Sequence, residues 1–177
     1  EYDECVFVKH GSDNQIIGIM ALHVDDLLIG CCTNDELNKI SKTLKAKFKN
    51  ITVKDGPIVD YLGMTLNFEH AGKVTVTQKG YVSDLITLYN VDKKSFNPAS
   101  GKLFVVGTDE EILDTEGQDY LRSGVAKLLY LAKRTVPELA PVVAFLSTRA
   151  EKFTISDLAK FDKAIAYLAT FEHKGIT

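Results

Sequence analysis

The chain has 177 residues, of which 45% are hydrophobic and 25% charged, proportions that are ordinary for a globular protein. This length fits one domain or two small ones, and no apolar run reaches the roughly 18 residues that a membrane-spanning helix needs. A net charge of −3 argues against a nucleic-acid-binding protein that depends on bulk positive charge. The three cysteines are predicted to be reduced thiols, and no secretory leader is recognisable. Because the first residue is not methionine, we expect a piece of a longer chain.

β-forming residues separated by turn residues dominate the first part of the chain. The sequence predicts strands over residues 5–10, 16–23 and 27–31. Thr33 and Glu36 predict a capping box, in which Thr33 caps a helix and Glu36 bonds back to the cap. The apolar stripe of that helix has helical spacing and is made by Leu37, Ile40, Leu44 and Phe48. Further on, the sequence predicts one strand over 58–68, a turn at 70–73 and a short strand over 74–77.

The rest of the chain is predicted to be mainly helical. A short helix over 81–89 turns Val82, Leu85 and either Leu88 or Tyr89 inward. Residues 103–121 hold six acidic side chains and no basic one, which predicts a solvated loop. Helices follow over about 118–134 and from Pro137 to about 148. The last helix has Ser156 as its candidate N-cap, and its stripe consists of Ile155, Leu158, Phe161, Ile165 and Leu168.

The order of these elements, with strands first and helices later, predicts an α+β protein. We expect an antiparallel sheet with a packed helix, followed by a helical bundle. The sheet portion occupies residues 1–91, an acidic irregular connection occupies 92–117, and the helical portion occupies 118–177.

Two adjacent carboxylates, Asp25 and Asp26, interrupt the otherwise apolar stretch 15–32 (QIIGIMALHVDDLLIGCC). An isolated buried carboxylate is costly and two neighbours repel each other, so such a pair needs an exposed turn or a bound cation. Carboxylates at a tight turn are ready ligands for Mg²⁺, which prefers oxygen ligands and often shares them with phosphate. An ordinary Asp-Asp turn without a metal is the alternative, and the pair alone does not decide between the two.

Four ordered blocks of sequence resemble the reverse transcriptases of copia-type retrotransposons. The first is the Val24-Asp25-Asp26 turn between apolar strands. The other three are Tyr61-Leu62-Gly63-Met64 with 76–86 (VTQKGYVSDLI), 120–147 (YLRSGVAKLLYLAKRTVPELAPVVAFLS), and 164–176 (AIAYLATFEHKGI). The resemblance implies the distal palm of an RNA-directed DNA polymerase, a palm-like sheet with a packed helix, followed by a helical thumb-like bundle.

The resemblance also implies roles for individual residues. Asp25 and Asp26 would be catalytic and hold Mg²⁺ or Mn²⁺ for two-metal nucleotidyl transfer. His23 stands where the family usually has a tyrosine packed beneath the primer end. The stretch Tyr61, Leu62, Gly63 and Met64 lies where the primer grip is expected. Contacts to nucleic-acid phosphates are expected from Gln78, Arg122, Lys127, Lys133 and Arg134, with Arg149 and Lys152 on the same helical end. Core packing with a strand bulge is the open alternative for Tyr61 to Met64. For His23 it is a strand histidine without a role, and for the basic residues it is surface solvation.

The family's first catalytic aspartate and its fingers have no counterpart in this sequence. We therefore expect weak or absent metal binding and no polymerase activity from this chain alone. The resemblance implies two kinds of partner, an RNA–DNA hybrid or template–primer and the remaining polyprotein segments, which are the fingers and ribonuclease H. It implies a location in cytoplasmic virus-like particles or the nucleus, with no membrane partner. The rival hypotheses are a non-enzymatic remnant that binds nucleic acid or protein, self-association included, and an enzyme assembled in trans from two chains.

Overall fold

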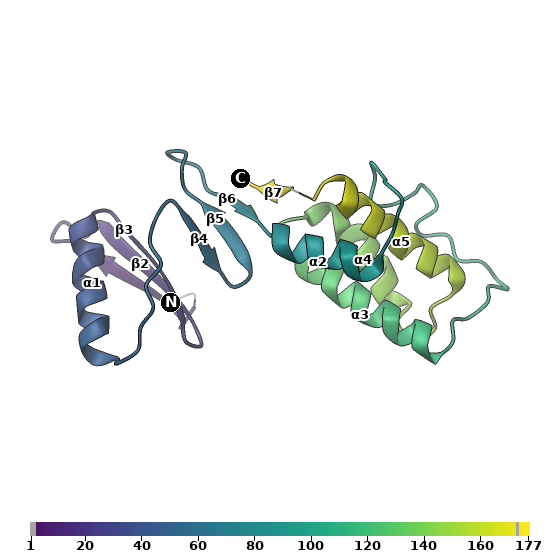
Figure 1. Cartoon of the computed structure of the whole chain (residues 1–177), viewed down its shortest axis with the longest axis horizontal. Helices are drawn as coiled ribbons and strands as arrows, with labels where there is room; N and C mark the ends of the chain where they lie inside the picture. The colour runs from purple at the N-terminus through teal and green to yellow at the C-terminus, as the bar shows by residue number, and fades with distance from the viewer. Residues whose placement is uncertain (1–2, 173) are drawn as a thin grey trace. The chain divides into compact units, whose positions relative to one another are not determined.

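A computed structural model describes residues 3–172 and 174–177 and divides the chain into two compact units (Figure 1). The N-terminal unit comprises residues 1–62 and the C-terminal unit residues 63–177. Both α-helices and antiparallel sheets are present, so the predicted α+β class is confirmed at this coarse level. None of the helices within the described residues is long and apolar enough to cross a membrane.

The N-terminal unit is built on a three-stranded antiparallel sheet in the order β1-β2-β3. Its strands confirm the three predicted ones, and they are β1 (Val6–His10), β2 (Ile16–His23) and β3 (Asp26–Cys31). Helix α1 (Asn34–Lys47) follows β3, and strand β4 (Ile58–Tyr61) ends the unit. Short turns suffice between the strands because antiparallel neighbours need no crossover.

Helix α1 lies on one face of this sheet. Lys9 of β1 is paired in register with Gly18 of β2, and its Nζ contacts a carboxylate oxygen of Glu36 on α1 at 2.5 Å. Glu36 also accepts from Lys39 at 2.7 Å. Thr33 is the N-cap, as predicted, and accepts from the Glu36 amide. The predicted return bond from the Glu36 side chain to the amide of Thr33 is wrong. The Glu36 carboxylate accepts from two lysines instead, and hydrogen bonds between charged groups are stronger than a bond to a neutral amide.

The opposite face of the sheet, which we call the open face, is apolar. Register places Val6 opposite Ala21 and Val8 opposite Ile19, so these side chains share that face. Val6, Val8 and Ile19 remain 43–48% exposed, and no described element of the N-terminal unit covers them. Gly18 is the sole buried residue among the described residues of this unit, which therefore lacks a core of its own.

The predicted single strand over 58–68 is wrong, because the chain turns back within it. Strand β4 ends at Tyr61 and β5 (Met64–Asn67) begins at Met64. Leu62 and Gly63 between them have φ of 50° and 73°. Two consecutive positive φ angles are typical of a type I′ turn, which usually carries Asn-Gly. Leu-Gly is an unusual sequence for it, which is why the turn was not predicted.

The C-terminal unit combines a small antiparallel sheet with a helical bundle that holds the core. Strand β6 (Thr75–Thr77) pairs with β5 and also with β7 (Gly175–Ile176), a strand that the sequence did not predict. The helices are α2 (Lys79–Tyr89), α3 (Thr115–Ala132), the 3₁₀ turn η1 (Pro137–Leu139), α4 (Ala140–Thr148) and α5 (Ile155–Thr170). The fully buried side chains include Leu121, Leu128, Leu139, Leu146, Phe153, Phe161 and Ile165.

The structure decides one open prediction in this unit and corrects two others. Tyr89, not Leu88, turns inward from α2. Helix α3 begins at Thr115 because the Asp114 side chain accepts from the Gly117 amide and caps it. Thr154 rather than Ser156 caps α5, in a capping box with Asp157. Acidic side chains of the 103–121 stretch thus serve as caps and partners as well as solvated groups, which the charge pattern alone did not reveal.

Candidate functional site

The turn between β2 and β3 is a two-residue hairpin loop that presents both carboxylates to solvent. His23 pairs with Asp26 across the ladder, which leaves Val24 and Asp25 as the two central residues. Val24 has φ of 57° and is 86% exposed. A positive φ at the first central residue is typical of a type II′ turn, where glycine is preferred. A side chain in this region is strained by about 1–2 kcal/mol, and such strain gathers at functional sites.

Asp25 and Asp26 are both exposed, as is His23. Because directly paired residues share a face, His23 and Asp26 lie on the open face, away from α1. Two adjacent carboxylates offer the hard oxygen donors that Mg²⁺ and Mn²⁺ prefer, so their chemistry fits part of a metal site. The described residues gather no group of three or more His, Cys, Asp or Glu side chains that could hold a metal ion.

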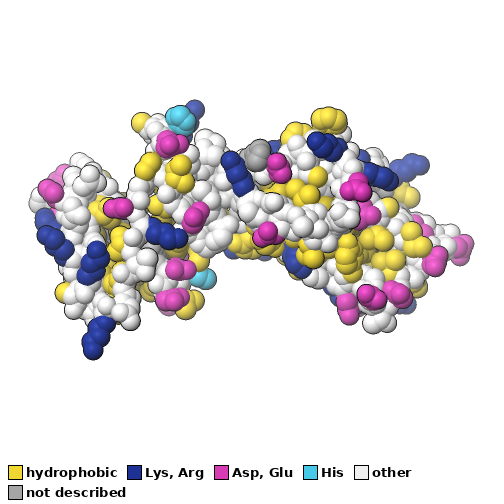
Figure 2. Space-filling model, viewed as in Figure 1, with side chains coloured by type: hydrophobic (Ala, Val, Ile, Leu, Met, Phe, Trp, Pro, Cys, Tyr) yellow, Lys and Arg dark blue, Asp and Glu magenta, His cyan; other side chains and the backbone are white. Residues whose placement is uncertain are grey.

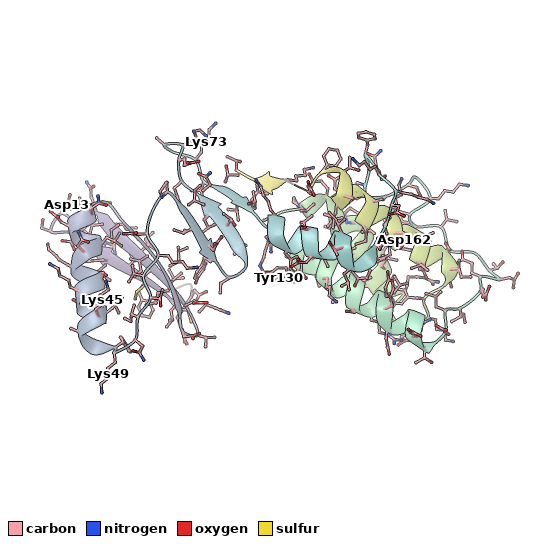
Figure 3. All side chains as sticks on the ribbon, in the orientation of Figure 1. Asp13, Lys45, Lys49, Lys73, Tyr130 and Asp162 are labelled. Carbon is pink, nitrogen blue, oxygen red and sulfur yellow. The ribbon has the colours of Figure 1, made fainter. Side chains whose placement is uncertain are left out.

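A tyrosine–arginine cluster, made by Tyr81, Tyr130 and Arg134, lies in the C-terminal unit beside Gly63. The Tyr81 and Tyr130 rings have centroids 5.0 Å apart, and the Arg134 guanidinium carbon lies 4.0 Å from the Tyr130 centroid. A Cβ on Gly63 would lie 3.1 Å from the Tyr130 hydroxyl oxygen, so only glycine fits without displacement. Figure 3 labels Tyr130 on the ribbon. The aromatic members were missed by sequence reasoning, although Tyr130 and Arg134 have the i,i+4 spacing of helical neighbours.

The predicted basic residues extend along and just beyond α3. Arg122 donates from Nε to the Ala150 carbonyl at 2.9 Å and from Nη1 to Asp119 at 2.8 Å. Lys127 donates to the Ser123 hydroxyl, whereas Lys133 is exposed. These bonds orient Arg122 and Lys127 along the helix but leave further donor hydrogens on each group.

Two of the predicted contact residues are engaged inside the fold. Gln78 is 2% exposed, and its Oε1 accepts from the Thr135 hydroxyl at 2.9 Å. Its Nε2 is buried without a partner in the described residues, so any nucleic-acid role would be through positioning rather than surface contact. Arg149 donates from Nε to the fully buried Asp157 at 3.1 Å and is thereby committed to the core.

The predicted site residues fall in both units. His23, Asp25, Asp26, Tyr61 and Leu62 belong to the N-terminal unit. The C-terminal unit holds Gly63, Met64, Gln78, Arg122, Lys127, Lys133 and Arg134. Within the C-terminal unit, Gly63 and Arg134 both meet Tyr130, so the turn and the end of α3 come together there.

Comparison with known proteins identifies the class. The family model described as reverse transcriptase (RNA-dependent DNA polymerase) matches residues 1–98, which is more than half of the chain. The chain therefore belongs to the reverse transcriptase family. Neither a curated protein nor a solved structure matches the sequence.

Proposed function

We propose that this chain supplies the distal palm and the thumb of an RNA-directed DNA polymerase of the copia type. The observation that carries the proposal is the hairpin loop of Val24 and Asp25 followed by Asp26. An exposed β-branched residue holds a positive φ there, and two carboxylates project from the same turn. Nothing about sheet packing requires this residue at the loop, because the Val24 side chain is 86% exposed.

Asp25 and Asp26 would hold divalent metal, which in two-metal nucleotidyl transfer polarises the primer hydroxyl and neutralises charge on the transferring phosphate. The carboxylates themselves provide negative charge and lone pairs at the turn. His23, on the same face as Asp26, offers an imidazole surface beneath the primer end. The open face of the sheet continues from these residues and offers apolar area to a further palm segment.

The tyrosine–arginine cluster and the basic residues of α3 supply the candidate nucleic-acid grip. Lys133, Arg134 and Lys127 provide positive charge at the end of the helix. Gly63 allows close approach to the Tyr130 hydroxyl oxygen, which keeps the turn and the helix together. Phosphate contacts of this kind are independent of sequence and weaken with salt, because each one releases a counterion.

Because the described residues add no third metal-ligating side chain to Asp25 and Asp26, we expect this chain alone to bind metal weakly and to incorporate no nucleotide in a primer-extension assay. Fingers and a further catalytic carboxylate would come from other segments of the polyprotein, on the same chain or in trans. Measured incorporation by the purified chain would refute this part of the proposal.

A Mn²⁺ titration of the ¹⁵N-labelled chain tests the metal site. Mn²⁺ should broaden the amides of Val24, Asp25 and Asp26 selectively, and an RNA–DNA hybrid should strengthen the effect. Asp25→Asn should abolish the broadening. Asp13→Asn is the matched control, because Asp13 is an exposed acid in the other hairpin turn of the same sheet. Equal broadening at Asp13 and Asp25, unchanged by the hybrid, would overturn the metal role.

The salt dependence of hybrid binding tests the grip. Lys133→Ala should lower the slope of log K against log salt by about one, whereas Lys73→Ala in the β5–β6 turn should leave it unchanged. Hybrid binding with this slope but without any metal response would favour the rival hypothesis of a non-enzymatic nucleic-acid-binding module.

A further inference from the structure

A groove of about 650 Å³ lies in the C-terminal unit, apart from every residue assigned above. Its walls come from the end of α2 and the segment after it, from the start of α3, and from α5. The residues that carry the argument are Tyr89, Lys93, Lys94, Tyr120 and Asp162. This volume falls within the range of small-molecule sites in proteins.

The walls of the groove are fixed by hydrogen bonds and ring packing. The Ser95 amide donates to the Ala166 carbonyl at 3.2 Å and to the Thr170 hydroxyl at 3.0 Å. Lys163 donates to the Ser95 hydroxyl at 3.0 Å, which fastens the segment after α2 to α5. A preformed site loses less conformational entropy on binding a ligand.

The aromatic wall consists of Tyr120 packed on buried rings. The Tyr120 ring lies 5.0 Å from that of Tyr89 and 6.2 Å from that of Phe161, both in edge-to-face geometry. Tyr120 itself remains 40% exposed. One ring surface is therefore held in place and still accessible to a flat ligand.

Asp162 is the unusual polar group of the groove (Figure 3). It is half-buried, and among the described residues no hydrogen bond or ion pair reaches its carboxylate. Burial raises its pKa, while the charge of Lys93 acts in the opposite direction. A partly accessible carboxylate that no donor of the described residues engages can accept from a ligand that brings two N–H groups.

We propose that this groove binds a guanine nucleotide, with the base against Tyr120 and its N1–H and 2-amino group donating to Asp162. Guanine is the common base that presents two parallel N–H donors to one carboxylate. Lys93 and Lys94, exposed at the rim, supply the positive charge that a phosphate requires. The same lysines, with Lys163, repel a cationic amine or guanidinium, which would otherwise suit Asp162. The proposal rests on the groove alone and does not depend on the polymerase assignment.

The proposal that the groove binds a guanine nucleotide is tested by NMR or calorimetric titration of the full chain with GMP, IMP, AMP and guanosine. GMP should bind more tightly than IMP, which lacks only the 2-amino group, by about ten-fold or more. Guanosine, which lacks the phosphate, should bind more weakly than GMP. Asp162→Asn should remove the preference for GMP over IMP while preserving the shape of the groove.

Asp84→Asn is the matched control, because Asp84 is an exposed acid on α2 outside the groove. It should leave all four affinities unchanged. Lys94→Ala should narrow the difference between GMP and guanosine without affecting the difference between GMP and IMP, because the charge that acts on Asp162 is that of Lys93. Absence of GMP binding at millimolar concentration, equal binding of GMP and IMP, or an Asp162→Asn variant that retains the preference would each overturn the proposal.

Discussion

Replacing Val24 by glycine should stabilise the hairpin that carries Asp25 and Asp26. An L-residue in the left-handed region costs about 1–2 kcal/mol, and glycine avoids this cost. Part of this stabilisation, about 0.5–1 kcal/mol, is lost because glycine gives the unfolded chain more conformational entropy. Because Val24 is 86% exposed, its removal forfeits almost no apolar burial. We therefore expect Val24→Gly to stabilise the hairpin by a net free energy of about 0.5–1 kcal/mol.

Native-state hydrogen exchange of the β2 and β3 ladder amides measures this effect locally. A gain of this size slows exchange about two- to five-fold for amides that open with the hairpin. Asn14→Gly in the β1–β2 turn is the matched control, because Asn14 has φ of 63° and asparagine tolerates this region. Faster exchange in Val24→Gly, or an equal gain in Asn14→Gly, would show that Val24 is not strained, and the argument from strain to function would fail.

Three further predictions concern the packing and the charges. Gly124→Ala should lower the free energy of unfolding in urea by about 1–3 kcal/mol, because the new Cβ would overlap the ring of the fully buried Phe161. An unchanged urea midpoint would contradict this. Asp157→Ala should lower the free energy of unfolding by about 3–5 kcal/mol, because it removes both the buried partner of Arg149 and the capping box with Thr154. Asp119→Ala, at an exposed pair with Arg122, should lower it by less than about 1 kcal/mol. Hydrogen bonds from Lys39, which has the larger effect, and from Lys9 lower the pKa of Glu36 from 4.5 to about 2. The stability that this pairing gives to the contact between α1 and the sheet should therefore be fully present above pH 4.5 and weaken as the pH falls toward 2. A carboxyl-carbon NMR titration of Glu36 checks this directly, and a midpoint near 4.5 would refute it.

The first three strands could be predicted from the sequence because each depends on local information. Apolar runs alternate with turn residues there, and the two aspartates mark the hairpin in the sequence itself. The turn at Leu62 and Gly63 could not be predicted in this way, since Leu-Gly is no standard signal for consecutive positive φ angles. The β7 strand was missed for a different reason. Two residues near the end of the chain pair with β6, about a hundred positions away, and no local pattern records that contact.

The residues of the candidate site also fall into those that local sequence reveals and those that only the folded structure reveals. Asp25, Asp26 and His23 are adjacent in sequence, so the hairpin could be found from the residues alone. Tyr81 on α2 meets Tyr130 on α3 only in the folded chain. Asp162 stands out only because its partial burial, and the lack of a hydrogen-bond donor among the described residues, are visible in three dimensions. Ionic partners are equally nonlocal. Glu36 was predicted to bond its own helix cap, but Lys9 lies 27 positions away and captures its carboxylate.

Buried side chains are distributed unequally between the two units, and this affects the stability of the aspartate hairpin. The C-terminal unit holds all of the large buried apolar side chains in the described part of the chain, whereas the described N-terminal unit buries a single glycine. Other hydrophobic side chains reach the surface in the view of Figure 2. The aspartate hairpin thus depends on ladder hydrogen bonds and on its turn rather than on a core, and such regions have low local stability. A surface that covered the apolar open face would add to the stability that holds this strained loop in place. Covering Val6, Val8 and Ile19 would raise the stability of the sheet by burying apolar area, and the cost of holding Val24 at positive φ would then be small beside that gain.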